Sequence, residues 1–160
     1  MAPDKVWTVE DKVQGHYELN LATECGDIVV RRADGVYVYQ LAVTVDDALA
    51  GVNQVVRGMD LLSSAPRQMY LQKLFGFPHP AYAHVPMLLA PDGRRLSKRD
   101  KDLDLGQLRQ RCSPEQIIGA LAFSCGLLSK MEAISARELA SVFRWEHVEN
   151  KPIILRGDFL

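Results

Sequence analysis

The chain has 160 residues, 48% hydrophobic and 24% charged, which is enough for one globular domain with a small appendage and excludes a disordered or fibrous protein. Its net charge of -1 excludes a globally basic nucleic-acid-binding protein, so any phosphate binding requires a local patch. No apolar run is long enough to cross a bilayer, and the first residues lack the layout of a signal peptide.

The three cysteines and four histidines are too widely scattered for a disulfide framework or a zinc site. We therefore expect no metal site in this chain. Free thiols of this kind fit a reducing compartment, so a cytoplasmic location is expected.

Extended segments dominate the first part of the chain. Short ones are expected at residues 6–9 and 17–21. Residues 27–32 and 36–45, rich in β-branched and aromatic side chains, flank an Asp-Gly turn and predict a hairpin whose second strand is buried on both faces. The adjacent carboxylates of Asp46 and Asp47 are then expected either to serve as turn and cap groups or to lie at the entrance of a functional site.

A strand, a helix and another strand are expected next. Residues 52–58 predict a strand. Serine followed closely by proline, in Ser63-Ser64-Ala65-Pro66, predicts a helix over residues 66–75, with the serine hydroxyl accepting an N–H of the first turn. Residues 82–89 predict another strand, which Pro86 places at an edge or a bulge.

The last third of the chain is expected to be helical. A short helix is expected at residues 107–111. Two capping boxes, Ser113 with Gln116 and Ser135 with Glu138, each predict the start of a further helix. The sequence therefore changes from α/β to helical character near residue 103.

A basic stretch follows the strand expected at residues 82–89. From Arg94 to Lys101 there are five cationic side chains and one acidic side chain, directly after a Pro-Asp-Gly turn. A cationic loop at the end of a strand is placed to meet an anion. The alternative is a solvated surface turn.

Four sequence features occur in a consistent order, and together they resemble the second half of the catalytic core of class I glutamyl-tRNA synthetases. The loop around Lys98 is similar to the K-L-S-K-R form of the class I K-M-S-K-S signature, with Arg95 in place of the first lysine. The features are Tyr39-Gln40-Leu41-Ala42 with Val45-Asp46-Asp47, Val56-Arg57-Gly58-Met59-Asp60, Ala65-Pro66-Arg67-Gln68, and Pro91-Asp92-Gly93 before Arg95-Leu96-Ser97-Lys98-Arg99.

Residues 11–15, 31–35 and 57–62 are similar to the glutamyl-queuosine tRNA(Asp) synthetase branch, which lacks an anticodon-binding domain. The resemblance implies an α/β fold. Residues 1–102 would be the C-terminal part of a Rossmann-type catalytic domain, and residues 103–160 a small helical region. It also implies ATP with Mg²⁺, glutamate and tRNA as substrates.

The resemblance also assigns roles to individual side chains. Lys98 and Ser97 would act in catalysis, closing over the ATP phosphates together with Arg95, Leu96 and Arg99. The alternative for Lys98 is a solvated lysine.

Two further residues would bind the amino acid. Arg57 would contact the glutamate carboxylate, for which its planar fork is suited, and Tyr39 would line the pocket. Asp60 would orient ATP or Arg57. The alternatives are an ion pair from Arg57 to a nearby aspartate and a half-buried strand tyrosine at Tyr39.

The family's H-I-G-H element and the zinc-binding cysteines of its upstream insert are absent from the sequence. We therefore expect a C-terminal half that lacks the N-terminal half of the catalytic domain and forms no adenylate alone. A competing hypothesis is a non-catalytic RNA-binding module, for which Phe143-Arg144-Trp145 offers aromatic and basic side chains. An unrelated phosphate-binding domain would require the four matches to be coincidence.

Overall fold

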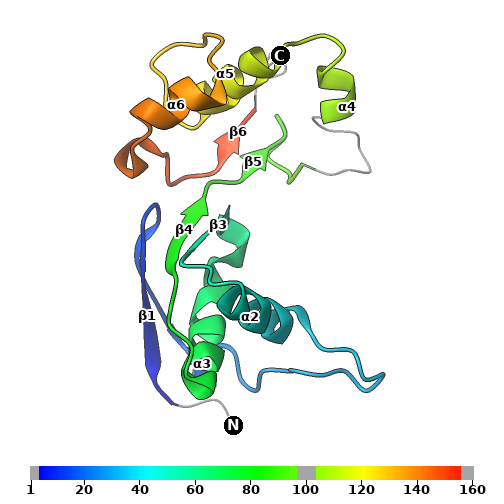
Figure 1. Ribbon diagram of the computed structural model, residues 1–160, viewed down its shortest axis with the longest axis vertical. Coiled ribbons are helices and arrows are strands. Elements are labelled where there is room, and N and C mark those ends of the chain that lie inside the picture. The colour runs from blue at the N-terminus through cyan, green and yellow to red at the C-terminus, as the bar shows by residue number, and fades with distance from the viewer. Residues whose placement is uncertain (1–3, 97–103, 156–160) are drawn as a thin grey trace. The chain divides into compact units, whose positions relative to one another are not determined.

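The computed structural model describes residues 4–96 and 104–155 (Figure 1). The chain forms two compact units, unit 1 (Met1–His84) and unit 2 (Val85–Leu160). The predicted boundary after residue 102 rests on the expected roles of the two parts and stays a prediction. The boundary between the two compact units lies earlier, after His84. Within the described ranges, no helix has the length and apolar character needed to cross a membrane.

Unit 1 contains a four-stranded sheet in the order β2-β1-β4-β3. β1 and β2 pair as an antiparallel hairpin, and β1 pairs in parallel with β4. At the start of β3 and β4, the Ala81 N–H donates to the Asn53 carbonyl at 2.9 Å. The strands are β1 (Val6–Asp11), β2 (Gly15–Asn20), β3 (Gln54–Gly58) and β4 (Ala81–Val85). The predicted α/β class and these extended segments are confirmed.

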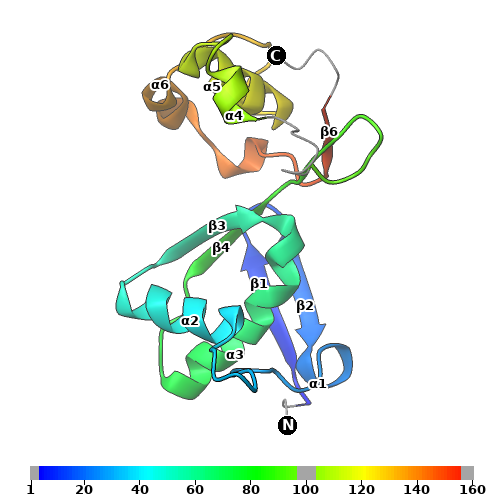
Figure 2. The same ribbon diagram turned by 90° about the vertical axis from the view of Figure 1, so that its right-hand side faces the viewer.

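Two helices cover one face of this sheet, as Figures 1 and 2 show. Alternate residues of β1 are buried, and Trp7 packs edge-to-face on Tyr70 of α3 with ring centroids 5.8 Å apart. The non-strand elements of unit 1 are α1 (Leu21–Glu24), α2 (Tyr39–Leu49), the 3₁₀ helix η1 (Met59–Ser64) and α3 (Ala65–Phe75).

The predicted hairpin of strands 27–32 and 36–45 is wrong, because residues 27–32 contain only an isolated bridge at Arg31 and the chain enters helix α2 at Tyr39. The turn before it is present, with an antiparallel bridge between Arg31 and Tyr37. Thr44, in the β-branched run, is 2% exposed, and its hydroxyl donates to the Gln40 carbonyl at 2.7 Å, one turn earlier. Packing of α2 against α3 therefore outweighs the local preference for a strand.

The predicted helix at residues 66–75 is confirmed as α3 and ends at Gly76, whose left-handed backbone (φ 71°) favours glycine. Its predicted cap is wrong, because η1 runs directly into α3 and the Ser64 side chain makes no capping bond. The segment 82–89 divides into β4 and β5 (Leu88–Leu89), so Pro86 lies beyond the end of an interior strand rather than at an edge or bulge.

In the described residues of unit 2, the regular elements are short helices and two two-residue strands, in agreement with the predicted helical region. Both capping boxes are present, with the Ser113 hydroxyl 3.2 Å from the Gln116 N–H and the Ser135 hydroxyl 3.2 Å from the Glu138 N–H. The first helix begins earlier than predicted because Asp104 caps it. The elements are β5 with its parallel partner β6 (Ile153–Ile154), α4 (Leu105–Leu108), α5 (Pro114–Ser124), α6 (Ala136–Val142) and the 3₁₀ helix η2 (Trp145–His147).

Candidate functional site

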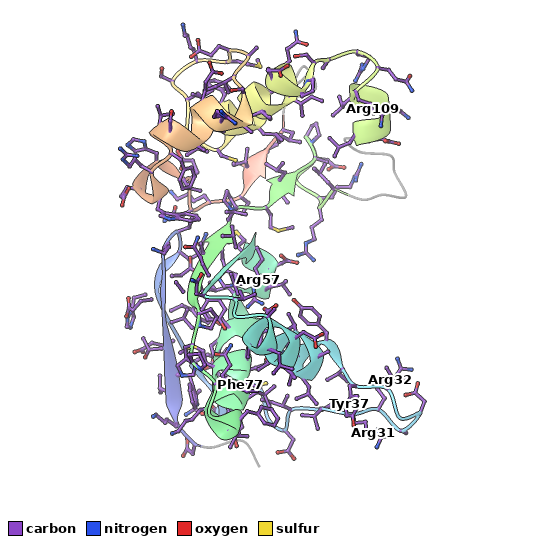
Figure 3. The ribbon with its side chains drawn as sticks, viewed as in Figure 1. Arg31, Arg32, Tyr37, Arg57, Phe77 and Arg109 are labelled. Atoms are coloured by element: carbon purple, nitrogen blue, oxygen red, sulfur yellow. The ribbon has the colours of Figure 1, made fainter. Side chains whose placement is uncertain are left out.

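The carboxyl ends of three strands in unit 1 bring polar side chains together. Asp11 is the last residue of β1, and Arg57 and His84 are the penultimate residues of β3 and β4. Figure 3 shows Arg57 at this end of the sheet. Ligands of α/β folds bind beyond the carboxyl ends of such strands, so this edge is the candidate site.

The Arg57 guanidinium is held by uncharged acceptors. Its Nε donates to His84 Nε2 at 2.9 Å, Nη1 to Gln68 Oε1 at 2.9 Å, and Nη2 to the Leu61 carbonyl at 3.3 Å. The guanidinium carbon also lies 5.5 Å from the centre of the Tyr82 ring. The alternative prediction, an ion pair from Arg57 to an aspartate, is not found within residues 4–96 and 104–155.

The tautomer of His84 follows from its two partners. An arginine Nε can only donate, so His84 Nε2 must accept and Nδ1 must carry the proton. Nδ1 then donates to Asp11 Oδ2 at 2.6 Å. Both side chains are fully buried, and burial lowers the pKa of His84, although the Asp11 carboxylate opposes this effect. His84 is therefore a neutral imidazole near pH 7.

The Asp11 carboxylate is fixed by several donors. It accepts the backbone N–H groups of Val13, Gln14 and His84 at 2.9–3.1 Å. Burial alone would raise the pKa of Asp11, but these hydrogen bonds and the His84 ring hold it below its ordinary value. The aspartate therefore stays ionised and keeps the imidazole in one orientation.

A second branch connects Arg57 to helix α2. The Gln68 amide donates to Gln40 Oε1 at 2.8 Å, and the Gln40 amide donates to the Ser64 hydroxyl at 2.9 Å. The serine predicted to cap α3 thus anchors α2 instead. Since Tyr39 precedes Gln40, this branch places the start of α2 relative to Arg57.

The predicted site residues fall in both units. In unit 1, Tyr39 is 52% exposed and begins α2, which excludes the strand-tyrosine alternative, and Asp60 lies exposed in η1, directly after β3. In unit 2, Arg95 is exposed and Leu96 half-buried. Ser97, Lys98 and Arg99 lie outside the described residues.

The turn before the basic loop is as predicted. The Gly93 N–H donates to the Ala90 carbonyl at 2.8 Å, and the Ala90 N–H donates to the Arg94 carbonyl at 2.9 Å. An isolated bridge then pairs Leu89 with Arg95. The chain therefore reverses tightly before the loop begins.

The aromatic side chains of the competing RNA-binding hypothesis face one another. Phe143 and Trp145 pack edge-to-face with ring centroids 4.8 Å apart, and both are half-buried. In such a pair the edge of one ring occupies a face of the other, which leaves less ring surface on which a base of single-stranded RNA could stack.

Four site residues had no predicted role: Asp11, Gln40, Gln68 and His84. The available signal was a histidine in an otherwise apolar strand and polar residues at strand ends. In the part of the chain that the structure describes, no group of three or more His, Cys, Asp or Glu side chains could hold a metal ion.

Comparisons with known proteins agree with this architecture. Residues 2–157 match the model of the family described as "tRNA synthetases class I (E and Q), catalytic domain". The glutamyl-Q tRNA(Asp) synthetase of Symbiobacterium thermophilum is 49% identical over 129 residues, which are 80% of this chain and 40% of that protein. The protein of the same name from Pseudomonas syringae pv. syringae is 53% identical over 96 residues, 60% of this chain and 32% of the relative.

Two solved structures share the fold. A glutamate tRNA ligase from Elizabethkingia meningosepticum, in complex with its amino acid, superposes with a TM-score of 0.82 at 24% identity, over 99% of this chain and 36% of that one. The glutamate-tRNA synthetase of Elizabethkingia anophelis gives 0.81 at 24% identity over the same shares. This chain therefore spans two fifths or less of the length of these relatives.

Proposed function

Since this chain belongs to the family of class I tRNA synthetases for glutamate and glutamine (the catalytic domain), we propose that it forms part of a ligase that activates glutamate. In the proposed reaction a carboxylate oxygen of glutamate attacks the α-phosphorus of ATP. The bond to pyrophosphate breaks, and glutamyl adenylate forms. A tRNA hydroxyl then takes the glutamyl group and releases AMP. The names of the relatives support this reaction class.

The observation that carries the proposal is the state of Arg57. Its acceptors are uncharged and use three of the five guanidinium N–H groups. The other two, one on each Nη, make no hydrogen bond to a described residue and have the fork geometry that fits a carboxylate. A half-buried cation with neutral partners favours an anionic ligand. We assign it the glutamate carboxylate that does not react, because that charge persists throughout the reaction.

ATP would be bound by the basic loop. Arg95, Leu96, Ser97, Lys98 and Arg99 are proposed to surround its phosphates, with Lys98 as the principal contact and Mg²⁺ held by phosphate oxygens. Asp60 is proposed to orient ATP or Arg57. The sequence has no H-I-G-H element, so adenylate formation is proposed only for a polypeptide that also supplies that part. The free thiols support a cytoplasmic location.

Calorimetric titration of the chain with glutamate tests the pocket. Replacing Arg57 with Lys removes the fork, and we expect affinity to fall about tenfold or more. Arg31→Lys is the matched control, because that guanidinium lies 5.3 Å from the Tyr37 ring on the exposed hairpin of Figure 3. Equal glutamate affinity in wild type and Arg57→Lys would contradict the assignment.

Two assays test the chemistry. The chain alone should give no glutamate-dependent ATP–pyrophosphate exchange, and sustained exchange would contradict the need for a second part. In a polypeptide that exchanges, Lys98→Ala should abolish the activity. Transfer of labelled glutamate to tRNA(Asp) with and without queuosine, compared with tRNA(Glu), identifies the acceptor. The glutamyl-Q relatives support the queuosine-containing tRNA(Asp).

A further inference from the structure

We propose that His84 is a positioning residue for glutamate binding: its neutral ring, held by Asp11, fixes the orientation of the Arg57 guanidinium toward the substrate carboxylate. This inference rests on the proposed function of Arg57. His84 itself touches no substrate in this proposal and acts through the arginine.

Two hydrogen bonds determine the guanidinium orientation. A guanidinium is planar, so fixing the direction of Nε–H and of one Nη–H fixes both its plane and its rotation within that plane. His84 fixes the first at 2.9 Å and Gln68 the second at 2.9 Å. The Tyr82 ring lies against the guanidinium and stacks on the His84 ring at 5.9 Å. The unused Nη–H groups therefore point in one defined direction.

The acceptor must be uncharged to fulfil this role. Asp11 from β1, Arg57 from β3 and Tyr82 from β4 are the titratable groups that contact the His84 ring. A protonated imidazole would direct a second N–H at the Arg57 Nε–H and break the bond. Because the Asp11 carboxylate accepts a hydrogen bond from Nδ1–H, the proton of the neutral ring stays on Nδ1 and Nε2 keeps its lone pair for the arginine. The aspartate thus sets the tautomer on which the arginine depends.

Substitutions separate positioning from a purely structural role. His84→Gln can place an amide oxygen where Nε2 accepts, whereas His84→Leu fills the space without an acceptor. His79→Gln is the matched control, because His79 Nδ1 lies 2.8 Å from Gln72 Oε1, whereas the Arg57 side chain bonds to His84, Gln68 and Leu61. The Arg57→Lys variant reports separately on the pocket.

The test combines glutamate titration with NMR of arginine Nε–H and histidine ring nitrogens in the whole chain. We expect the Nδ1–H tautomer at His84 and a slowly exchanging Arg57 Nε–H. His84→Leu should lose that resonance and weaken glutamate binding about fivefold to tenfold, while His84→Gln and His79→Gln stay within about twofold. An unchanged Arg57 resonance or unchanged affinity in His84→Leu overturns the proposal, as does equal weakening in His84→Gln.

The two proposals fail in different ways. If the wild-type chain gives no glutamate-dependent signal, the proposed pocket is contradicted for this chain. The role of His84 in holding Arg57 is then decided by the Nε–H resonance alone, which either disappears in His84→Leu, as proposed, or persists and refutes it.

Discussion

Replacing Asp11 with Ala tests how far the buried polar cluster stabilises unit 1. The carboxylate accepts backbone N–H groups of Val13, Gln14 and His84 and the His84 ring N–H. Val13 and Gln14 are half-buried, so water can reach their N–H groups after the substitution. The two His84 donors are buried and would be left without an acceptor.

The magnitude follows from these two donors. Each buried donor left without a partner costs about 1–3 kcal/mol, and Asp11→Ala leaves two of them on the neutral His84. We therefore expect Asp11→Ala to lower the free energy of unfolding by about 2–6 kcal/mol, a large part of the ~5–15 kcal/mol of an ordinary domain. Asp11→Asn keeps one oxygen for the backbone donors and should cost less.

Urea unfolding followed by Trp7 fluorescence provides the measurement, because Trp7 is 6% exposed in the core of unit 1. A Trp145→Phe background removes the signal of unit 2. Asp34→Ala is the matched control: Asp34 accepts the Val36 N–H at 3.2 Å in the same local pattern, but it is exposed, so its loss should cost less than about 1 kcal/mol. Equal losses in the two alanine variants would refute the reasoning.

Three further predictions concern pH, a close contact and a cap. Burial lowers the pKa of His84 from 6.5, so as the pH falls the unfolded chain binds this proton before the folded chain does. The free energy of unfolding of unit 1, measured by urea titration, should therefore decrease as the pH falls below about 6.5. His84→Leu should make this decrease less steep, and an unchanged slope would contradict the role of His84. Gly119→Ala would bring a methyl group against the Glu132 carbonyl, so it should lower the melting temperature of unit 2. This loss is expected although alanine stabilises a helix by about 1 kcal/mol relative to glycine. A higher melting temperature would show that the backbone at Glu132 does not pack closely on Gly119. Ser113→Ala removes the α5 cap and should cost about 1 kcal/mol in the same thermal melt, with no change contradicting the assignment.

Elements determined by local contacts were predictable from sequence. The capping boxes at Ser113 and Ser135 lie within four residues of their partners, and both appear as expected. Helix α2 was not predictable in this way. Its Val43-Thr44-Val45 run favours a strand, and the contact that decides the outcome is with α3, which follows only after β3 and η1.

The residues of the candidate site show the same difference between local and long-range information. Tyr39 and Arg57 were predicted as glutamate-binding residues from motif order, which local sequence preserves, and that role stays a prediction. His84 and Asp11 are 73 residues apart, and only the parallel pairing of β1 with β4 brings them together. Strand register and order are long-range properties, so sequence could indicate polar strand ends without showing which of them meet.

Uncharged hydrogen-bond partners fix the orientation of the Arg57 guanidinium without neutralising its charge, so the side chain can still bind an anion. A carboxylate of the protein about 4 Å from Arg57 would hold it with about 4 kcal/mol at an effective dielectric constant near 20, and any anionic ligand would have to compete with that attraction. His84, Gln68 and the Leu61 carbonyl orient the guanidinium without neutralising it. The negative charge of Asp11 lies behind the imidazole, where it fixes the ring instead of contacting the arginine. The cluster therefore leaves the positive charge of Arg57 unneutralised and holds the guanidinium in one orientation, as binding of the proposed carboxylate ligand requires.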